Sequence, residues 1–306
     1  MGKIDFLNVG PLTSIQDAGR FGALVYGVAA SGPMDQGAFN RAGDLLVKSG
    51  MGQSTTALEC ATGRLEFVIH GENIWGAFCG GDFFLKIDGK PCDWEAAHPL
   101  PNGAKIEITP GARGNYAIVR LNHEFDVPLT VGSRSTNMIA KLGGFGGRLI
   151  EKSDVISLIP VSSDRKLQEI HTASPSDVSG PVRFIWGLHA DLFSTEIREA
   201  FLHNPFVISP MLDRMGVRLK DPQNVFGAPQ NLSLVSDTIV PGDIQILGDG
   251  TPIVLMRDHQ PTGGYPRIAT IISADLDRFA QLRPGNEVSF TSIDVNRAHK
   301  IFKSGG

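Results

Sequence analysis

Short apolar segments with a two-residue period, separated by tight-turn dipeptides, are the feature that most restricts how this chain of 306 residues can fold. Leu65, Phe67 and Ile69 alternate with polar or smaller residues, and Asp88-Gly89 and Asn102-Gly103 are dipeptides typical of hairpin turns. A period of two places every second side chain on the same face of a strand. We therefore expect a mainly β chain with few helices, folded into barrels or sandwiches.

Four segments have the spacing and capping signals of helices. In residues 35–49 the apolar side chains fall on one helical face, Asp35 is placed as the N-cap, and Gly50 ends the segment. Asp294 is placed to cap the shorter helix expected over residues 295–303. These shorter segments are residues 192–202, 274–282 and 295–303.

The chain is long enough for about two domains. A polar stretch with little apolar periodicity lies between Val161 and Gly180, which is typical of a connection. We expect an N-terminal β-rich half over residues 1–165, a connection over 166–180, and a C-terminal β-rich half over 181–306.

Composition argues against several classes of partner. A net charge of -4 and a pI near 6.1, with 28 scattered Lys and Arg, provide no basic surface for nucleic acid. The first residues lack the pattern of a signal peptide, and no apolar run has the length of a membrane span. We expect a cytoplasmic protein that uses neither nucleic acid nor a membrane.

Common catalytic signatures are not found in the sequence. The three cysteines form no CxxC pair, and the eight histidines show no paired spacing for a metal. The glycine-rich segment Gly143–Gly147 lacks the Lys-Ser/Thr ending of a phosphate-binding loop. We expect buried thiols and no metal site, and any use of ATP or biotin would depend on another chain.

A polar, glycine-rich loop, residues 258–267, lies between two segments expected to be buried strands, 252–256 and 268–272. Asp258 is the candidate base or amide-orienting acceptor, because it follows a buried strand where loss of water makes a carboxylate a stronger base. Tyr265 is the candidate donor to a developing oxyanion. Gln260, Thr262, Gly263 and Gly264 are the expected substrate-binding residues of this loop. The alternative is a wide hairpin whose polar side chains satisfy their own backbone.

A second polar loop lies near the N-terminus, in residues 13–22. Gln16 offers an amide donor and acceptor, while Asp17 and Arg20 add a carboxylate and a guanidinium, so we expect all three to bind substrate. The alternatives are turn residues on the surface and a local bridge between Arg20 and Asp17. Arg214 could likewise bind a carboxylate or phosphate of a ligand or form a bridge to Asp213, and we favour the bridge.

The two loops, in order with several other segments, resemble one family. The other segments are Leu58-Glu59, residues 132–136, 143–148 and 209–219, and Gly242-Asp243-Ile244-Gln245. The chain is similar to the C-type subunits of 5-oxoprolinase, also called allophanate hydrolase subunit 2, a family related to the C-terminal part of the carboxyltransferase domain of urea carboxylase. This resemblance implies cyclophilin-like β-barrels.

The resemblance also implies three functions. The first is one component of an ATP-dependent 5-oxoprolinase, inactive alone, which opens 5-oxoproline to glutamate. Its partners would be a B-type subunit, of the allophanate hydrolase subunit 1 family, and a LamB/YcsF-like A-type subunit. The second is a carboxyltransferase half that moves a carboxyl group to urea or a related amide from biotin on a partner. The third is a regulatory binding module, as in family members that modulate a histidine-kinase inhibitor.

Several positions depart from the family pattern. Residues 123–125 are His-Glu-Phe where glycines are usual, Pro261 replaces a threonine, and Leu212 replaces a serine. Pro261 removes an amide donor and Leu212 removes a hydroxyl, so both changes subtract polar contacts. If those contacts orient substrate, the substrate or the partner of this chain differs from that of other members.

Overall fold

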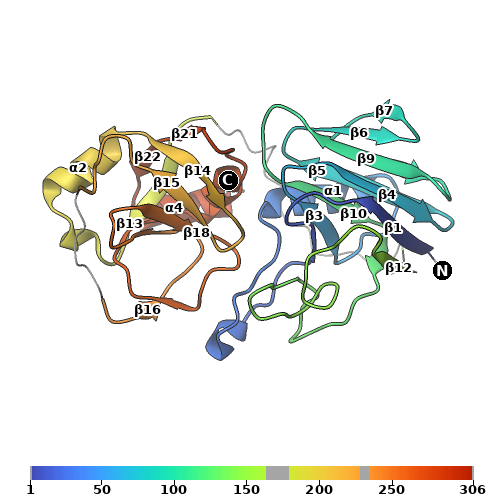
Figure 1. Cartoon of the computed structure of the whole chain (residues 1–306), viewed down its shortest axis with the longest axis horizontal. Coiled ribbons are helices and arrows are strands. Elements are labelled where there is room, and N and C mark those ends of the chain that lie inside the picture. Colours follow the sequence, from blue (N-terminus) through green and yellow to red (C-terminus); the bar gives the residue numbers. More distant parts are fainter. Residues whose placement is uncertain (1, 163–178, 228–233, 305–306) are drawn as a thin grey trace. The chain divides into compact units, whose positions relative to one another are not determined.

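The computed structural model describes residues 2–162, 179–227 and 234–304 (Figure 1). The chain divides into a first unit, Met1–Ala23 with Ala30–Pro175, and a second unit, Leu24–Ala29 with Ser176–Gly306. Almost all of the predicted connection, residues 166–180, lies outside the described residues. The predicted boundaries at 165 and 181 therefore stay a prediction.

The first unit contains two antiparallel sheets. The larger sheet has the strand order β11-β12-β1-β4-β9-β6-β7 and the smaller has the order β2-β3-β10-β5-β8. The larger sheet consists of β1 (Gly2–Asn8), β4 (Leu65–His70), β6 (Phe83–Ile87), β7 (Lys90–Cys92), β9 (Lys105–Pro110), β11 (His123–Phe125) and β12 (Val155–Pro160). The smaller consists of β2 (Ser14–Gln16), β3 (Ala57–Cys60), β5 (Ile74–Gly80), β8 (Ala96–Leu100) and β10 (Ala117–Leu121).

The smaller sheet is covered on both faces. Val119 and Leu121 of β10 belong to the main core with Phe67 of the larger sheet, whereas Ile118 packs with Leu46 of helix α1 (Gln36–Lys48). Successive side chains of a strand point to opposite faces, so a strand between a core and a helix is buried on both of its faces. This explains why β10 is buried at every position.

The second unit is built on a mixed sheet that curls into a nearly closed barrel, with the order β21-β14-β15-β18-β17-β20-β13-β22. Its strands are β13 (Val182–Trp186), β14 (Phe206–Leu212), β15 (Gly216–Lys220), β17 (Asp243–Ile246), β18 (Pro252–Leu255), β20 (Arg267–Ile271), β21 (Glu287–Val288) and β22 (Phe290–Ser292). A separate two-stranded ribbon pairs β16 (Asp237–Thr238) with β19 (Thr262–Gly263).

Aromatic side chains fill the second unit. Phe201 of helix α2 (Thr195–His203) stacks on Phe290 with ring centroids 5.1 Å apart, and it also contacts Phe184, Phe206 and Phe226. Such ring pairs add about 0.5–1.5 kcal/mol beyond the area that they bury. A single helical side chain thus joins α2 to strands from both ends of the sheet.

The predicted fold class, mainly β with few helices, is confirmed, and so are the capping signals. Asp35 precedes α1 and accepts a hydrogen bond from the Ala38 amide at 2.7 Å. Asp294 caps α4 (Val295–Lys303) through the Arg297 amide at 2.9 Å. The remaining helices are α3 (Ser273–Ala280) and the short 3-10 helices η1 (Ala23–Tyr26) and η2 (Ala190–Leu192). None of the helices in the described ranges is long and apolar enough to cross a membrane.

Candidate functional site

The predicted polar loop of the second unit lies between strands β18 and β20, as expected. Its centre, Thr262–Gly263, forms β19 and pairs with β16, with Asp237 opposite Gly263. A Cβ built on Gly263 would lie 2.4 Å from Nε2 of Gln245, which is closer than any real contact allows. Glycine at 263 lets the Gln245 amide lie close to the loop backbone, and a larger residue there would displace that side chain.

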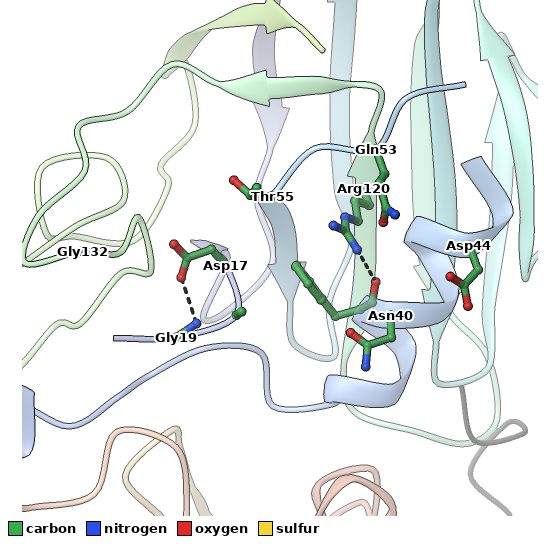
Figure 2. A pocket seen from close by; sticks show the side chains of 10 residues that line it. Asp17, Gly19, Asn40, Asp44, Gln53, Thr55, Arg120 and Gly132 are labelled. Atoms are coloured by element: carbon green, nitrogen blue, oxygen red, sulfur yellow. Dashed lines mark hydrogen bonds between the residues drawn. The ribbon is translucent and has the colours of Figure 1, made fainter. Parts of the chain in front are cut away.

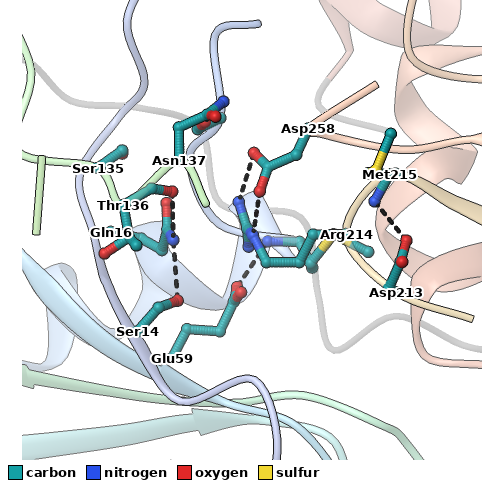
Figure 3. Close-up of polar contacts among 12 residues, drawn as sticks. Ser14, Gln16, Glu59, Ser135, Thr136, Asn137, Asp213, Arg214, Met215 and Asp258 are labelled. Atoms are coloured by element: carbon teal, nitrogen blue, oxygen red, sulfur yellow. Dashed lines mark hydrogen bonds and ion pairs between the residues drawn. The ribbon is translucent and has the colours of Figure 1, made fainter. Parts of the chain in front are cut away.

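Asp258 and Arg214 form a buried two-point ion pair (Figure 3). Nε of Arg214 donates to Oδ2 of Asp258 at 2.8 Å and Nη2 donates to Oδ1 at 3.2 Å, and the two side chains are only 2% and 3% exposed. The Asp258 amide also donates to the Arg214 carbonyl at 2.7 Å. Arg214 offsets the negative charge and fixes the orientation of the carboxylate, so Asp258 fits the orienting role better than that of a free base.

Asp213, which we expected to form an ion pair with Arg214, instead accepts hydrogen bonds from backbone amides. Its Oδ1 accepts the amides of Met215 at 2.7 Å and Gly216 at 3.1 Å (Figure 3). These bonds shape the turn between β14 and β15. That turn holds Arg214 at the strand end from which it reaches Asp258.

Three side chains of the loop are exposed to solvent. Gln260 and Thr262 are exposed, and Tyr265 is 44% exposed, with no hydrogen bond from its hydroxyl to any described residue. Next to them, Gly263 and Gly264 are half-buried. An amide, a hydroxyl and a phenol beside accessible backbone are suited to holding a small polar ligand, and a rigid sheet positions them.

A hydrogen-bonded network around the buried side chains of Arg267 and Asp243 was not assigned a role from the sequence. Arg267 donates to Asp237 Oδ2 at 2.6 Å, to the Thr238 carbonyl at 2.8 Å and to Asp243 Oδ2 at 3.3 Å. Oδ1 of Asp243 accepts from the Thr270 hydroxyl at 2.6 Å. The network ties the ribbon of β16 and β19 to the barrel. In the sequence, Asp243 of the Gly-Asp-Ile-Gln segment was the only indication of this network. Its partners Arg267 and Thr270 are 24 and 27 residues away in the chain, so the sequence did not connect them.

In the first unit, Asp17 organises the segment 133–135. Its carboxylate accepts from the hydroxyls of Ser133 and Ser135 at 2.6 and 2.7 Å, from the Arg134 amide at 2.6 Å and from the Gly19 amide at 3.0 Å. Burial raises the pKa of Asp17, but these hydrogen bonds outweigh burial and the pKa lies below its ordinary value. The charged form of Asp17 is therefore the one that stabilises this unit.

Gln16 and Arg20 form hydrogen bonds to this segment and to residues near it. Arg20 is buried and donates to the carbonyls of Thr130 and Ser135 at 3.0 and 2.8 Å. Nε2 of Gln16 donates to the Ser14 hydroxyl at 2.9 Å and to the Thr136 carbonyl at 3.3 Å (Figure 3). The Gln16 Oε1 atom is buried and has no hydrogen-bond partner within the described part of the chain. The structure brings all three predicted residues together, and each makes contacts that support the loop.

The pH dependence of stability tests the assignment of Asp17. A lowered folded-state pKa means that the contribution is present above the unfolded pKa and is lost as pH falls through the folded pKa. We expect Asp17→Asn to be less stable than the wild type at pH 7, and this difference to shrink steadily from about pH 4 downward. Urea unfolding followed by circular dichroism at several pH values measures it. A difference that is constant with pH would contradict the assignment.

The departure from the family pattern at residues 123–125 has a packing explanation. The Glu124 carboxylate accepts the amides of Thr55 and Thr56 at 2.6 and 3.2 Å and the Thr56 hydroxyl at 2.8 Å, and Phe125 lies in the main core. His123 is also buried. These residues stabilise the first unit, so this departure alone does not indicate a different substrate.

A cavity of about 310 Å³ in the first unit borders the Asp17 loop (Figure 2). Asp17, Ala18 and Gly19 form part of its wall, and α1 and Arg120 of β10 contribute other parts. The sequence did not reveal this cavity, because its lining comes from segments more than one hundred residues apart.

Comparison with known proteins agrees with the resemblance seen in the sequence. Residues 26–292 match the model of the carboxyltransferase domain, subdomain A and B. The C-type subunit of the 5-oxoprolinase of Escherichia coli K12 is 30% identical over 97% of this chain and 93% of its own length, and that of Haemophilus influenzae is 29% identical over 97% and 94%. The K. lactis urea amidolyase structure superposes with a TM-score of 0.85 at 26% identity, over 99% of this chain and 19% of the other. The chain thus belongs to the family of the carboxyltransferase domain, subdomain A and B.

Proposed function

We propose that this chain is one component of a heteromeric, ATP-dependent 5-oxoprolinase that opens 5-oxoproline to L-glutamate. The observation that carries the proposal is the match to two C-type subunits of 5-oxoprolinase over 93% and 94% of their length, against 19% of the urea amidolyase chain. A B-type subunit is the proposed partner, together with a LamB/YcsF-like A-type subunit. ATP would be bound within the complex.

The loop at 258–265 is the proposed site of the lactam. Asp258, fixed by Arg214, has oxygen lone pairs left to accept the lactam N–H, and its orientation does not depend on the substrate. The Tyr265 hydroxyl would donate to the lactam carbonyl oxygen as negative charge develops on it. Gln260, Thr262 and the backbone at Gly263 and Gly264 would hold the rest of the ring.

The residues of the N-terminal loop have a supporting role in this proposal. Asp17 and Arg20 direct their hydrogen bonds to residues 130–135. Gln16 differs, because its buried Oε1 still lacks a donor among the described residues. An unpaired buried acceptor costs about 1–3 kcal/mol, so a donor supplied by a ligand would be favoured there.

A second candidate is transfer of a carboxyl group to urea or a related amide, with biotin on a partner chain. The structural match to the K. lactis urea amidolyase favours it. The same groups would serve, since orienting an amide N–H and polarising a carbonyl are common to both reactions. A regulatory module that binds without turnover is the third candidate.

Reconstitution distinguishes these candidates. The chain would be mixed with the B-type and A-type proteins, and ATP hydrolysis would be measured with and without 5-oxoproline. We expect stimulation by 5-oxoproline only when all chains are present. A stable complex without this stimulation, but with urea-dependent turnover once biotin carboxylase and biotin carrier proteins are added, would replace the proposal by the carboxyltransferase. Binding without turnover in every combination would leave the regulatory module.

A further inference from the structure

The cavity of the first unit has the size of a small-molecule site. Its volume of about 310 Å³ is at the lower end of the range for ligand pockets. Its polar lining comes from α1, from residues 53 and 55, from Asp17 and from Arg120, as Figure 2 shows. The proposed lactam-binding loop, residues 258–265, contributes nothing to this lining. All of the lining residues belong to the first unit, whereas that loop belongs to the second.

Arg120 brings a buried positive charge to the cavity wall. It is 3% exposed, its Nε donates to the Ser54 carbonyl at 2.9 Å and its Nη1 to the Phe39 carbonyl at 3.1 Å, and its guanidinium stacks 4.2 Å from the centre of the Phe39 ring. No carboxylate of the described residues is within ion-pair distance of it. Burial lowers the pKa of Arg120 to about 10, and Glu124 and Asp44 counter this only through longer-range attraction. An anion in the cavity would compensate this charge.

Gln53 places an uncommitted amide beside that charge. The residue is 7% exposed, it lines the cavity, and its side chain makes no hydrogen bond to any described residue. A Cβ built on Gly43 of α1 would lie 2.1 Å from Oε1 of Gln53 and 2.4 Å from Nη1 of Arg120. Gly43 thus lets the helix backbone approach both polar groups, and the amide is held in place with hydrogen-bonding capacity that a ligand can use.

The other charges of the cavity are negative. Asp44 of α1 is half-buried and forms no ion pair with a described residue, whereas the oxygens of Asp17 are occupied by four donors. One guanidinium and two carboxylates leave the lining with an excess of negative charge. A ligand that satisfies both signs needs an anionic and a cationic group, and it should carry no net negative charge.

We propose that this cavity binds a neutral zwitterionic α-amino acid, with its carboxylate against Arg120 and the Gln53 amide and its ammonium group against Asp44. Asn40, one helical turn before Asp44 on α1, lines the space beside it and offers an amide to a polar substituent. A second carboxylate on the ligand would meet Asp17 or Asp44, so acidic amino acids are disfavoured. The proposal rests on residues of the first unit and does not depend on the 5-oxoprolinase proposal.

Titration calorimetry on the full chain tests the site. Glycine, L-alanine, L-serine and L-glutamine would be titrated singly, and we expect saturable binding of at least one of them with a Kd below about 1 mM, as befits ten or fewer heavy atoms. Two derivatives of the amino acid that binds would then be titrated: the α-amide, which lacks the carboxylate, and the N-acetyl derivative, which lacks the ammonium group. Each should bind at least about tenfold more weakly. L-glutamate should also bind more weakly than L-glutamine.

Variants connect the binding to these residues. Asp44→Asn should weaken binding about tenfold and Gly43→Ala, which fills the space beside Gln53 and Arg120, should abolish it. Asp126→Asn is the matched control, because it removes the same charge from an exposed residue that does not line the cavity. Asp44 lies on the helix surface, so its variant keeps the test valid even if Gly43→Ala does not fold. The proposal is overturned if no amino acid of the panel saturates up to about 10 mM, if acetate binds equally well, or if Asp44→Asn binds like the control.

Discussion

Replacing Tyr265 by phenylalanine is expected to lower the 5-oxoproline-dependent ATP hydrolysis of the assembled complex about a hundredfold. Removing one donor to a developing oxyanion typically costs a factor of about 10² to 10³ in turnover. The Tyr265 hydroxyl makes no hydrogen bond to a described residue, and the ring is 44% exposed. Its loss should therefore leave the free energy of unfolding unchanged.

Tyr26→Phe is the matched control for this experiment. Tyr26 is 79% exposed, and its replacement removes the same hydroxyl from the surface of the protein. Initial rates at saturating and at limiting 5-oxoproline separate kcat from KM. A hydroxyl that acts only in the transition state lowers kcat and kcat/KM equally when it is removed, whereas the loss of one that only holds the ring raises KM. Wild-type rates for Tyr265→Phe would exclude Tyr265 from the chemistry.

Local signals predicted the elements of this fold well. Asp35 and Asp294 cap the helices that their positions indicated, and α4 has the predicted bounds, Val295–Lys303. The strands on either side of the 258–267 loop were expected within one residue of where they lie. Capping and two-residue periodicity act within a few residues of the chain, so a sequence contains them directly.

Partners that come from strand register could not be predicted in the same way. We expected Arg214 to bridge Asp213, but the pairing of β15 with β18 sets Gly216 opposite Leu255 and brings Arg214 to Asp258, 44 residues further on. Asp17 likewise finds its partners at residues 133–135. A polar motif indicates that its side chains need partners, but only the tertiary fold decides whether a ligand or the protein provides them.

The cavity could not be predicted from the sequence for the same reason, because only the tertiary fold brings its lining residues together. Arg120 belongs to a largely apolar strand, β10, and Gln53 to the irregular segment between α1 and β3, and neither has a motif around it. Their juxtaposition depends on Gly43, whose missing Cβ leaves room for both. A glycine inside a helix costs about 1 kcal/mol relative to alanine. Gly43 inside the helix was therefore the one indication in the sequence that other side chains pack closely against the helix backbone there.

Replacing Asp258 by asparagine is expected to lower the free energy of unfolding by about 1.5–3 kcal/mol, the contribution of hydrogen bonds to a charged group, besides abolishing turnover of the complex. The change removes the negative charge from a side chain that accepts two hydrogen bonds from the Arg214 guanidinium. The neutral amide can still accept one hydrogen bond, but it presents an NH₂ group where the second oxygen accepts from Arg214. Urea unfolding of the isolated chain measures the stability loss, and Asp126→Asn again controls for the change in net charge.

A double-mutant cycle separates the structural role of Asp258 from its role in the reaction. If the ion pair dominates stability, Asp258→Ala and Arg214→Ala should each be strongly destabilising, and the double variant should lose clearly less than the sum of the two, because each single variant already removes the same pairwise interaction. Turnover should stay absent in the double variant even though part of the stability returns. Activity that recovers together with stability would mean that Asp258 only maintains the loop, and Tyr265 with the exposed groups beside it would then carry the substrate contacts alone.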